Sequence, residues 1–78
     1  MIDYLTLKNS YIGAIQMGLE LNFPDPKQGN EILHKFCENC VDHSNYSEQD
    51  KLDLKRDLEL LKEILSQEIE LYIHGAQQ

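Results

Sequence analysis

The stretch from Ser47 to His74 contains neither glycine nor proline, and this feature constrains the fold more than any other in the sequence. Ser47 is a favourable helix N-cap, and acidic residues follow it in the first turn, where the helix dipole favours negative charge. A helix over residues 48–74, ending before Gly75, would be about 40 Å long at 1.5 Å per residue. Its apolar residues recur in steps of three and four, which is typical of a bundle seam. They are Leu54, Leu58, Leu61, Leu65 and Tyr72, with Ile69 beside them.

A second apolar row lies about 100° around the same predicted helix and consists of Leu60, Ile64 and Leu71. Either two neighbouring helices cover both rows, or the second row faces a second copy of the chain in a homodimer. Glu68 stands where a further apolar residue of the first seam would fall. The long C-terminal helix therefore carries more apolar surface than one neighbouring helix can cover.

Four acidic residues of this helix have no Lys or Arg three or four positions away in the favourable direction. These residues are Asp57, Glu63, Glu68 and Glu70. Beside exposed apolar side chains they would form a docking surface for a basic protein, although an ordinary solvated face has the same composition. The predicted partner-binding residues are these four acids together with Leu60, Ile64 and Leu71.

Two shorter helices are predicted before the long one. The first covers about residues 3–21, with Asp3 as its N-cap, and Gly18 lies on its apolar face, where we expect another backbone to approach closely. Pro24 and Pro26 end this helix because proline lacks an amide donor and disfavours helical geometry in the preceding residue. Asp25 then caps a second helix over 26–42, with Pro26 at its first position.

The second predicted helix has a narrow apolar stripe, with charged residues opposite. The stripe consists of Ile32, Leu33, Phe36, Cys37, Cys40 and Val41. Glu31, His34 and Lys35 fall on the other side, which we expect to face solvent. The predicted fold is thus an all-α, small three-helix bundle with a long C-terminal helix, and residues 1–78 form a single helical domain.

His34, Cys37, Cys40 and His43 are potential metal ligands spaced three residues apart. On a helix this spacing spreads the four side chains across about 180°, so they cannot all converge on one tetrahedral ion. Burial of the two cysteines in the apolar stripe explains them without a metal. A redox function is disfavoured because the Cys37–Cys40 pair lies near a helix C-terminus, where the dipole opposes a thiolate. We therefore predict no metal and no cofactor, and keep a metal site at this cluster as an alternative.

The charge balance narrows the possible partners. Fourteen acidic and seven basic residues give a net charge of −7, which disfavours direct nucleic-acid binding and attachment to an anionic membrane. The sequence contains no recognisable signal peptide or membrane-spanning stretch, and two cysteines are too few for a disulfide framework, so a cytoplasmic location is expected. The negative charge favours a basic protein partner.

No catalytic motif is apparent, and a three-helix chain of this size has little room for an enclosed active site, so we do not expect an enzyme. The favoured function is that of a noncatalytic protein–protein interaction module. Such a module would be an acidic modulator or inhibitor of a partner, like immunity proteins, antitoxins and phage-encoded inhibitors in size and charge. The alternatives are a small helical subunit or chaperone of a larger assembly, and a metal-binding protein that uses the His34, Cys37, Cys40 and His43 cluster.

Overall fold

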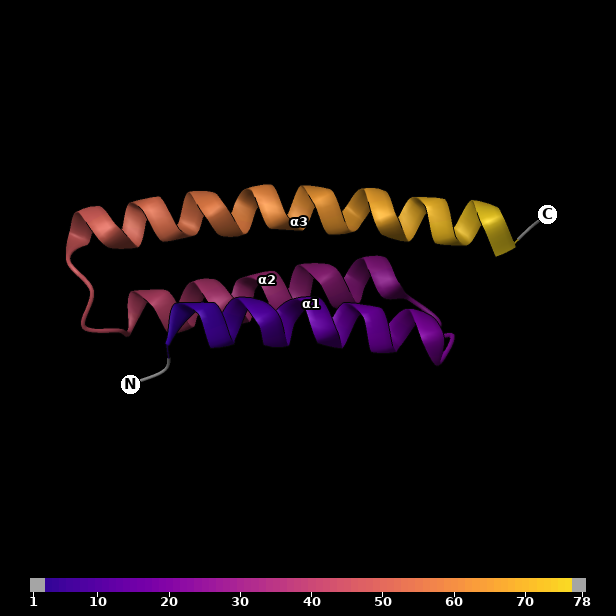
Figure 1. Ribbon diagram of the computed structural model, residues 1–78, viewed down its shortest axis with the longest axis horizontal. Coiled ribbons are helices and arrows are strands. Elements are labelled where there is room, and N and C mark those ends of the chain that lie inside the picture. The colour runs from indigo at the N-terminus through magenta and orange to yellow at the C-terminus, as the bar shows by residue number, and fades with distance from the viewer. Residues whose placement is uncertain (1–2, 77–78) are drawn as a thin grey trace.

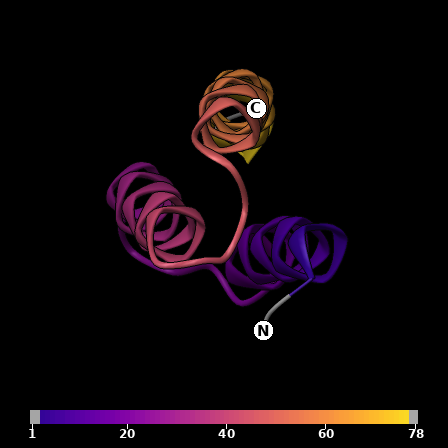
Figure 2. The same cartoon turned by 90° about the vertical axis from the view of Figure 1, so that its left-hand side faces the viewer.

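The described residues form three helices, each antiparallel to the one before it, so that the first and third run in the same direction (Figure 1). The computed structural model describes residues 3–76, which form α1 (Tyr4–Glu20), α2 (Pro26–Asp42) and α3 (Glu48–Ala76). In Figure 1, α2 returns beside α1, and α3 runs back along both. Seen from the end, the helices stand at the corners of a triangle (Figure 2). The predicted all-α three-helix bundle with a long C-terminal helix is confirmed.

Each helix begins at its predicted cap. The side chains of Asp3, Asp25 and Ser47 accept hydrogen bonds from the backbone N–H three residues further on, at 3.3, 3.1 and 3.1 Å. These bonds satisfy amides that have no partner within the helix. Pro26 occupies the first turn of α2, where its missing N–H costs nothing. The helix starts are therefore determined by local chemistry.

The end of α1 corrects the prediction made for Gly18. Asn22 adopts a positive φ of 57°, and the amide of Phe23 donates to the carbonyl of Gly18 at 3.0 Å, as in a Schellman motif. The ring of Phe23 folds back onto Gly18, so that a Cβ on Gly18 would lie 3.0 Å from the ring. The Phe23 ring, from the turn after α1, fills the space beside Gly18. The prediction that another backbone approaches closely there is therefore wrong.

The end of α3 lies two residues beyond the predicted one. Gly75 does not adopt a positive φ, so it does not form a left-handed cap, and the helix continues to Ala76. Although α3 has 29 residues, it carries eight acidic and four basic side chains. Among the helices of residues 3–76, none combines the length and apolar character that a bilayer-spanning helix requires.

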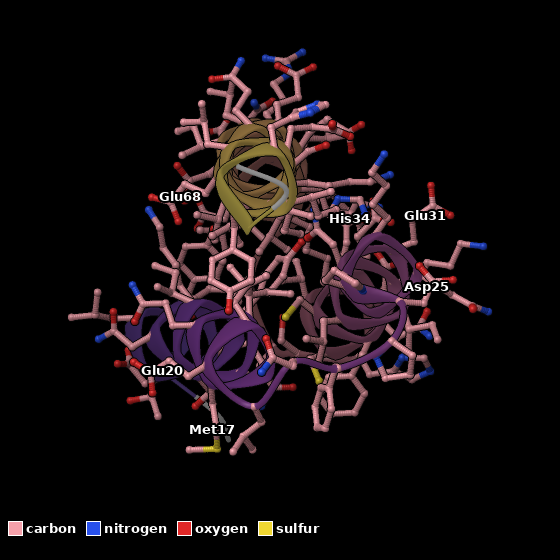
Figure 3. All side chains as sticks on the ribbon, turned by 90° about the vertical axis from the view of Figure 1, so that its right-hand side faces the viewer. Met17, Glu20, Asp25, Glu31, His34 and Glu68 are labelled. Carbon is pink, nitrogen blue, oxygen red and sulfur yellow. The ribbon has the colours of Figure 1, made fainter. Side chains whose placement is uncertain are left out.

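Nine buried apolar residues form the core, and all three helices contribute to it. They are Leu7, Tyr11, Ile15, Cys37, Val41, Leu58, Leu61, Leu65 and Ile69. The predicted seam of α3 holds as far as Leu65, and then Ile69 enters the core in place of Tyr72, which is 40% exposed. At 3.6 residues per turn, steps of three and four drift around the helix, and the step from Leu65 to Ile69 corrects this drift. Glu68 therefore lies beside the seam and does not interrupt it (Figure 3).

The buried face of α2 is rotated from the predicted one. Ile32 and Phe36 are 59% and 58% exposed, whereas Asn30 and His34 are 3% and 5% exposed. The expectation that His34 faces solvent is wrong, as is the expectation that the whole apolar stripe packs inward. Asn30 and His34 can be buried because polar groups of α1 and α3 face them, which no pattern within α2 alone reveals.

Asn30 connects all three helices at the centre of the bundle. Its side-chain oxygen accepts a hydrogen bond from the Tyr11 hydroxyl of α1, and its amide donates to the Lys62 carbonyl of α3 at 3.1 Å. The Tyr11 hydroxyl also lies 3.2 Å from the Asn30 carbonyl. Burial raises the pKa of Tyr11, which keeps the hydroxyl protonated and able to donate.

Candidate functional site

The second apolar row of α3 remains outside the core. Leu60, Ile64 and Leu71 are 59%, 55% and 74% exposed. Neither α1 nor α2 covers them, because the other face of α3 packs on these two helices. A row of three large apolar side chains along about 16 Å of helix is long enough to contact two to three turns of a partner helix.

Two of the four predicted docking acids form ion pairs with other helices. Asp57 lies 3.0 Å from Lys8 of α1 and accepts a hydrogen bond from the Tyr4 hydroxyl. The hydrogen bond from Tyr4, and then the one from Lys8, lower the pKa of Asp57. Glu70 pairs with Lys27, whose hydrogen bond lowers the pKa of Glu70. These two acids therefore already have basic partners on the neighbouring helices.

Glu63 and Glu68 differ from these two acids. Both are exposed, and within residues 3–76 neither forms an ion pair with a basic side chain. By their helical positions they lie on opposite sides of the row of Leu60, Ile64 and Leu71. The structure thus narrows the predicted surface to three apolar residues flanked by two acids, and we call this set the α3 surface.

A groove between α1 and α2 forms a second apolar surface, which the sequence did not indicate. Its volume is about 290 Å³, and α1, α2 and the turn between them supply its walls. The lining residues are Ala14, Ile15, Gly18, Phe23, Asp25, Pro26, Gly29, Ile32 and Leu33. Asp25 is the one charged residue among them. The groove was missed because Ile32 was assigned to the core.

Exposed apolar side chains extend this second surface along both helices. Phe36 lies one turn beyond Ile32 on α2 and is 58% exposed, and Met17 of α1 is 61% exposed. Figure 3 shows Met17 on the side of α1 that faces away from α3. We call the groove together with Phe36 and Met17 the α1–α2 surface. Met17 thus lies on the side of the bundle away from α3 (Figure 3), which carries eight of the fourteen acidic residues.

The cluster of His34, Cys37, Cys40 and His43 does not converge. Cys37 is 2% exposed in the core, and burial raises the pKa of its thiol to about 11. Cys40 and His43 line the same hollow beside α1, and Nδ1 of the exposed His43 lies 2.8 Å from the carbonyl of Asn39. His34 is directed toward α3 (Figure 3). The four side chains therefore do not all converge on one point, as the predicted fan requires.

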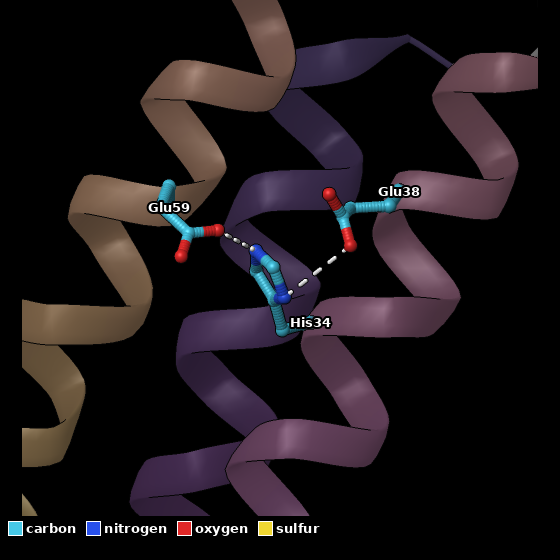
Figure 4. A group of neighbouring side chains, drawn as sticks. All are labelled: His34, Glu38 and Glu59. Carbon is cyan, nitrogen blue, oxygen red and sulfur yellow. Dashed lines mark ion pairs between the residues drawn. The ribbon is translucent and has the colours of Figure 1, made fainter.

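His34 has two carboxylates as neighbours, one from its own helix and one from α3 (Figure 4). Its Nε2 lies 3.1 Å from an oxygen of Glu59, and its Nδ1 lies 3.5 Å from an oxygen of Glu38. The His34 side chain is 6% exposed, while that of Glu59 is 58% exposed. The sequence grouped His34 with Cys37, Cys40 and His43, whereas its acidic neighbours in the structure are Glu38, on the same helix, and Glu59, which is distant in the sequence.

Two ion pairs bracket this histidine along the contact between α2 and α3. Lys62 of α3 lies 3.9 Å from Glu31, and Lys55 lies 2.8 Å from Asp42. Because the helices are antiparallel, His34 and Glu59 lie between these two pairs. The pairs match the register of α2 against α3, and they occupy Lys62 and Lys55, the lysines three and four residues from Glu59.

Comparison with known proteins adds no assignment, since no family model, no curated protein and no solved structure matches this chain.

Proposed function

We propose that this protein is a noncatalytic protein–protein interaction module that binds a basic, amphipathic helix of a partner protein on the α3 surface. The observation that carries the proposal is the exposure of Leu60, Ile64 and Leu71 in a line between the acids Glu63 and Glu68. An amphipathic helix recognises a partner through apolar residues at such helical spacings. Basic residues beside its apolar stripe would meet the two flanking acids.

Charge supports a basic partner. The chain has a net charge of −7, and α3 carries eight of its fourteen acidic residues. A surface of one sign accelerates association with a partner of the opposite sign, and salt screens this effect. We therefore expect association to slow with rising ionic strength, while the apolar contacts maintain the bound state. Binding of this kind would serve an inhibitor or modulator, and equally a subunit or chaperone of a larger assembly.

Affinity capture with matched variants tests this function. The double variant Leu60→Ser with Ile64→Ser should lose a basic protein that the wild-type chain captures from a cell extract at low salt. The control carries Ile32→Ser with Phe36→Ser on the opposite surface and should capture that protein normally. All four side chains are more than half exposed, so both variants should fold. Loss of capture in the control with retention in the α3 variant would contradict the assignment to α3.

Self-association through the α1–α2 surface is a second candidate function. Two copies that met through α3 would bring eight acidic and four basic side chains of each copy together, which like-charge repulsion opposes. The groove between α1 and α2 has one charged lining residue, Asp25, and is otherwise formed mostly by apolar side chains. A homodimer is therefore better placed on this surface than on the C-terminal helix.

Sedimentation velocity tests the dimer directly. The wild-type chain should sediment as a dimer, and Ile32→Glu should convert it to a monomer, because the substitution places a charge in an apolar contact. Leu60→Glu on α3 makes the same change on the other side of the bundle and should leave the dimer intact. A wild-type monomer at all concentrations would eliminate this second function without affecting the first.

A further inference from the structure

We infer that His34, Glu38 and Glu59 form a binding site for a divalent transition-metal cation, for which Zn²⁺ is the probe. The site lies between α2 and α3 and shares no residue with the α3 surface or the α1–α2 surface. Its ligands also differ from the cluster of cysteines and histidines that the sequence indicated, with His34 the one residue in common.

The three donor groups are close enough to share one ion. One atom from each residue, a ring nitrogen of His34 and one oxygen each of Glu38 and Glu59, lies within 4.8 Å of the others. Bond lengths to zinc of about 2.0–2.2 Å place two ligands of a tetrahedral ion roughly 3.4 Å apart. The observed 3.1 Å between Nε2 of His34 and the Glu59 oxygen is near this value. Glu59 needs only a small side-chain rotation, whereas Glu38, whose oxygen lies 3.5 Å from Nδ1, must turn toward the Nε2 side of the ring.

An unpartnered buried atom points to a ligand at this place. The side chain of His34 is 94% buried, and in the structure of residues 3–76 its Nε2 has no hydrogen-bond partner. It nevertheless faces a carboxylate oxygen at 3.1 Å, in a geometry that does not make a hydrogen bond. Buried polar atoms are rarely left unsatisfied. A cation between the nitrogen lone pair and the carboxylate would satisfy both groups.

Two neighbouring helices bring the three residues together. His34 and Glu38 are four residues apart on α2 and therefore share one face. Glu59 approaches from α3, between the pairs of Lys62 with Glu31 and Lys55 with Asp42. The lysines are thus engaged with their own acids on either side of the proposed ion.

The donor set defines the class of cation. One imidazole nitrogen suits Zn²⁺ and its first-row neighbours, whereas Mg²⁺ and Ca²⁺ prefer oxygen ligands alone. The two carboxylates and the neutral imidazole balance the charge of a divalent ion. The exposed side of Glu59 leaves room for water to complete the coordination. Bound metal would link α2 to α3 and stabilise the folded chain.

Calorimetric titration of the tag-free, metal-stripped protein with Zn²⁺ tests the site. We expect one ion per chain and a higher thermal unfolding midpoint with metal. Glu59→Gln and Glu38→Gln should each weaken the affinity at least about tenfold, since even indirect supports of a metal site have effects of this size. Glu20→Gln removes the same charge from an exposed position on α1 and should leave the affinity unchanged. All three positions have partly or fully exposed side chains, so the variants should fold.

Two results would overturn the inference. The first is the absence of saturable Zn²⁺ binding by the wild-type chain. The second is wild-type affinity in Glu59→Gln, which would place the ion elsewhere. Co²⁺ distinguishes the two possible sets of ligands. Ligation by Cys37 or Cys40 produces a thiolate charge-transfer band, whereas ligation by His34 and the two glutamates does not. That band, or loss of binding in Cys40→Ser, would assign the metal to the cysteines and contradict the proposed ligands.

Discussion

Leu58→Ala should lower the free energy of unfolding by about 3 kcal/mol, within the usual range for truncating a buried leucine. Leu58 is 0% exposed and lies among the core residues of all three helices. A 78-residue domain has few kcal/mol of stability, so this loss should leave a substantial unfolded population. We expect this loss to be the largest for any single leucine-to-alanine substitution in α3, because neither water nor a neighbouring loop can fill the space that the Leu58 side chain leaves.

Leu60→Ala is the matched control, and it should cost less than about 0.5 kcal/mol. Both substitutions replace leucine by alanine in the interior of α3, so helix propensity changes equally and cancels from the comparison. Leu60 is 59% exposed. Urea unfolding, monitored by circular dichroism, gives the free energy of unfolding of both variants by the same linear extrapolation. Equal losses at the two positions would contradict the structure, since they would require a covered Leu60 in the folded chain.

The positions of the helices were predictable because the signals for them are local. Asp3, Asp25 and Ser47 cap helices within three residues of themselves, and Pro24 and Pro26 act on their immediate neighbours. Gly75 shows the limit of such signals. Glycine permits a left-handed cap but does not require one, and the helix continues through it.

The rotation of α2 was not predictable from its own sequence. Hydrophobicity alone placed Ile32 and Phe36 inside and His34 outside, and the structure reverses these positions. The reversal depends on partners in other helices: Tyr11 of α1 and the Lys62 carbonyl of α3 satisfy Asn30, and Glu59 of α3 faces His34. A polar residue is buried when another element supplies its partner, and the hydrophobic pattern of one helix contains no such information.

In the candidate sites, too, features within one helix were predictable and contacts between helices were not. The apolar row on α3 was predictable because it depends on spacing within one helix, whereas its exposure was left open because it depends on where the other two helices pack. The pairing of Asp57 with Lys8 was not, since the partners lie on different helices, and neither was the meeting of His34 with Glu59. In a bundle, the ion-pair partners of a charged residue therefore cannot be inferred only from the residues three and four positions away, because some partners lie on another helix.

Asn30→Ala should lower the free energy of unfolding by about 2 kcal/mol, because it removes a buried hydrogen-bond acceptor and a donor at once. The Tyr11 hydroxyl would keep the residue 30 backbone carbonyl as an acceptor, whereas the Lys62 carbonyl would lose the Asn30 amide. Tyr11→Phe removes the other half of the side-chain bond and should cost about 1 kcal/mol. Urea unfolding of each variant measures these losses.

The double variant determines whether the two residues act as a unit. If the Tyr11–Asn30 hydrogen bond stabilises the bundle, Tyr11→Phe with Asn30→Ala should cost at least about 0.5 kcal/mol less than the sum of the single changes. Tyr72→Phe is the control, since its hydroxyl donates to an amide oxygen of Asn22 at 3.0 Å but the ring is 40% exposed. Its effect should be small and should add to that of Asn30→Ala. If the losses from Tyr11→Phe and Asn30→Ala simply add, then Asn30 stabilises the bundle only through its hydrogen bond to α3. Its side chain would then connect two helices and not three.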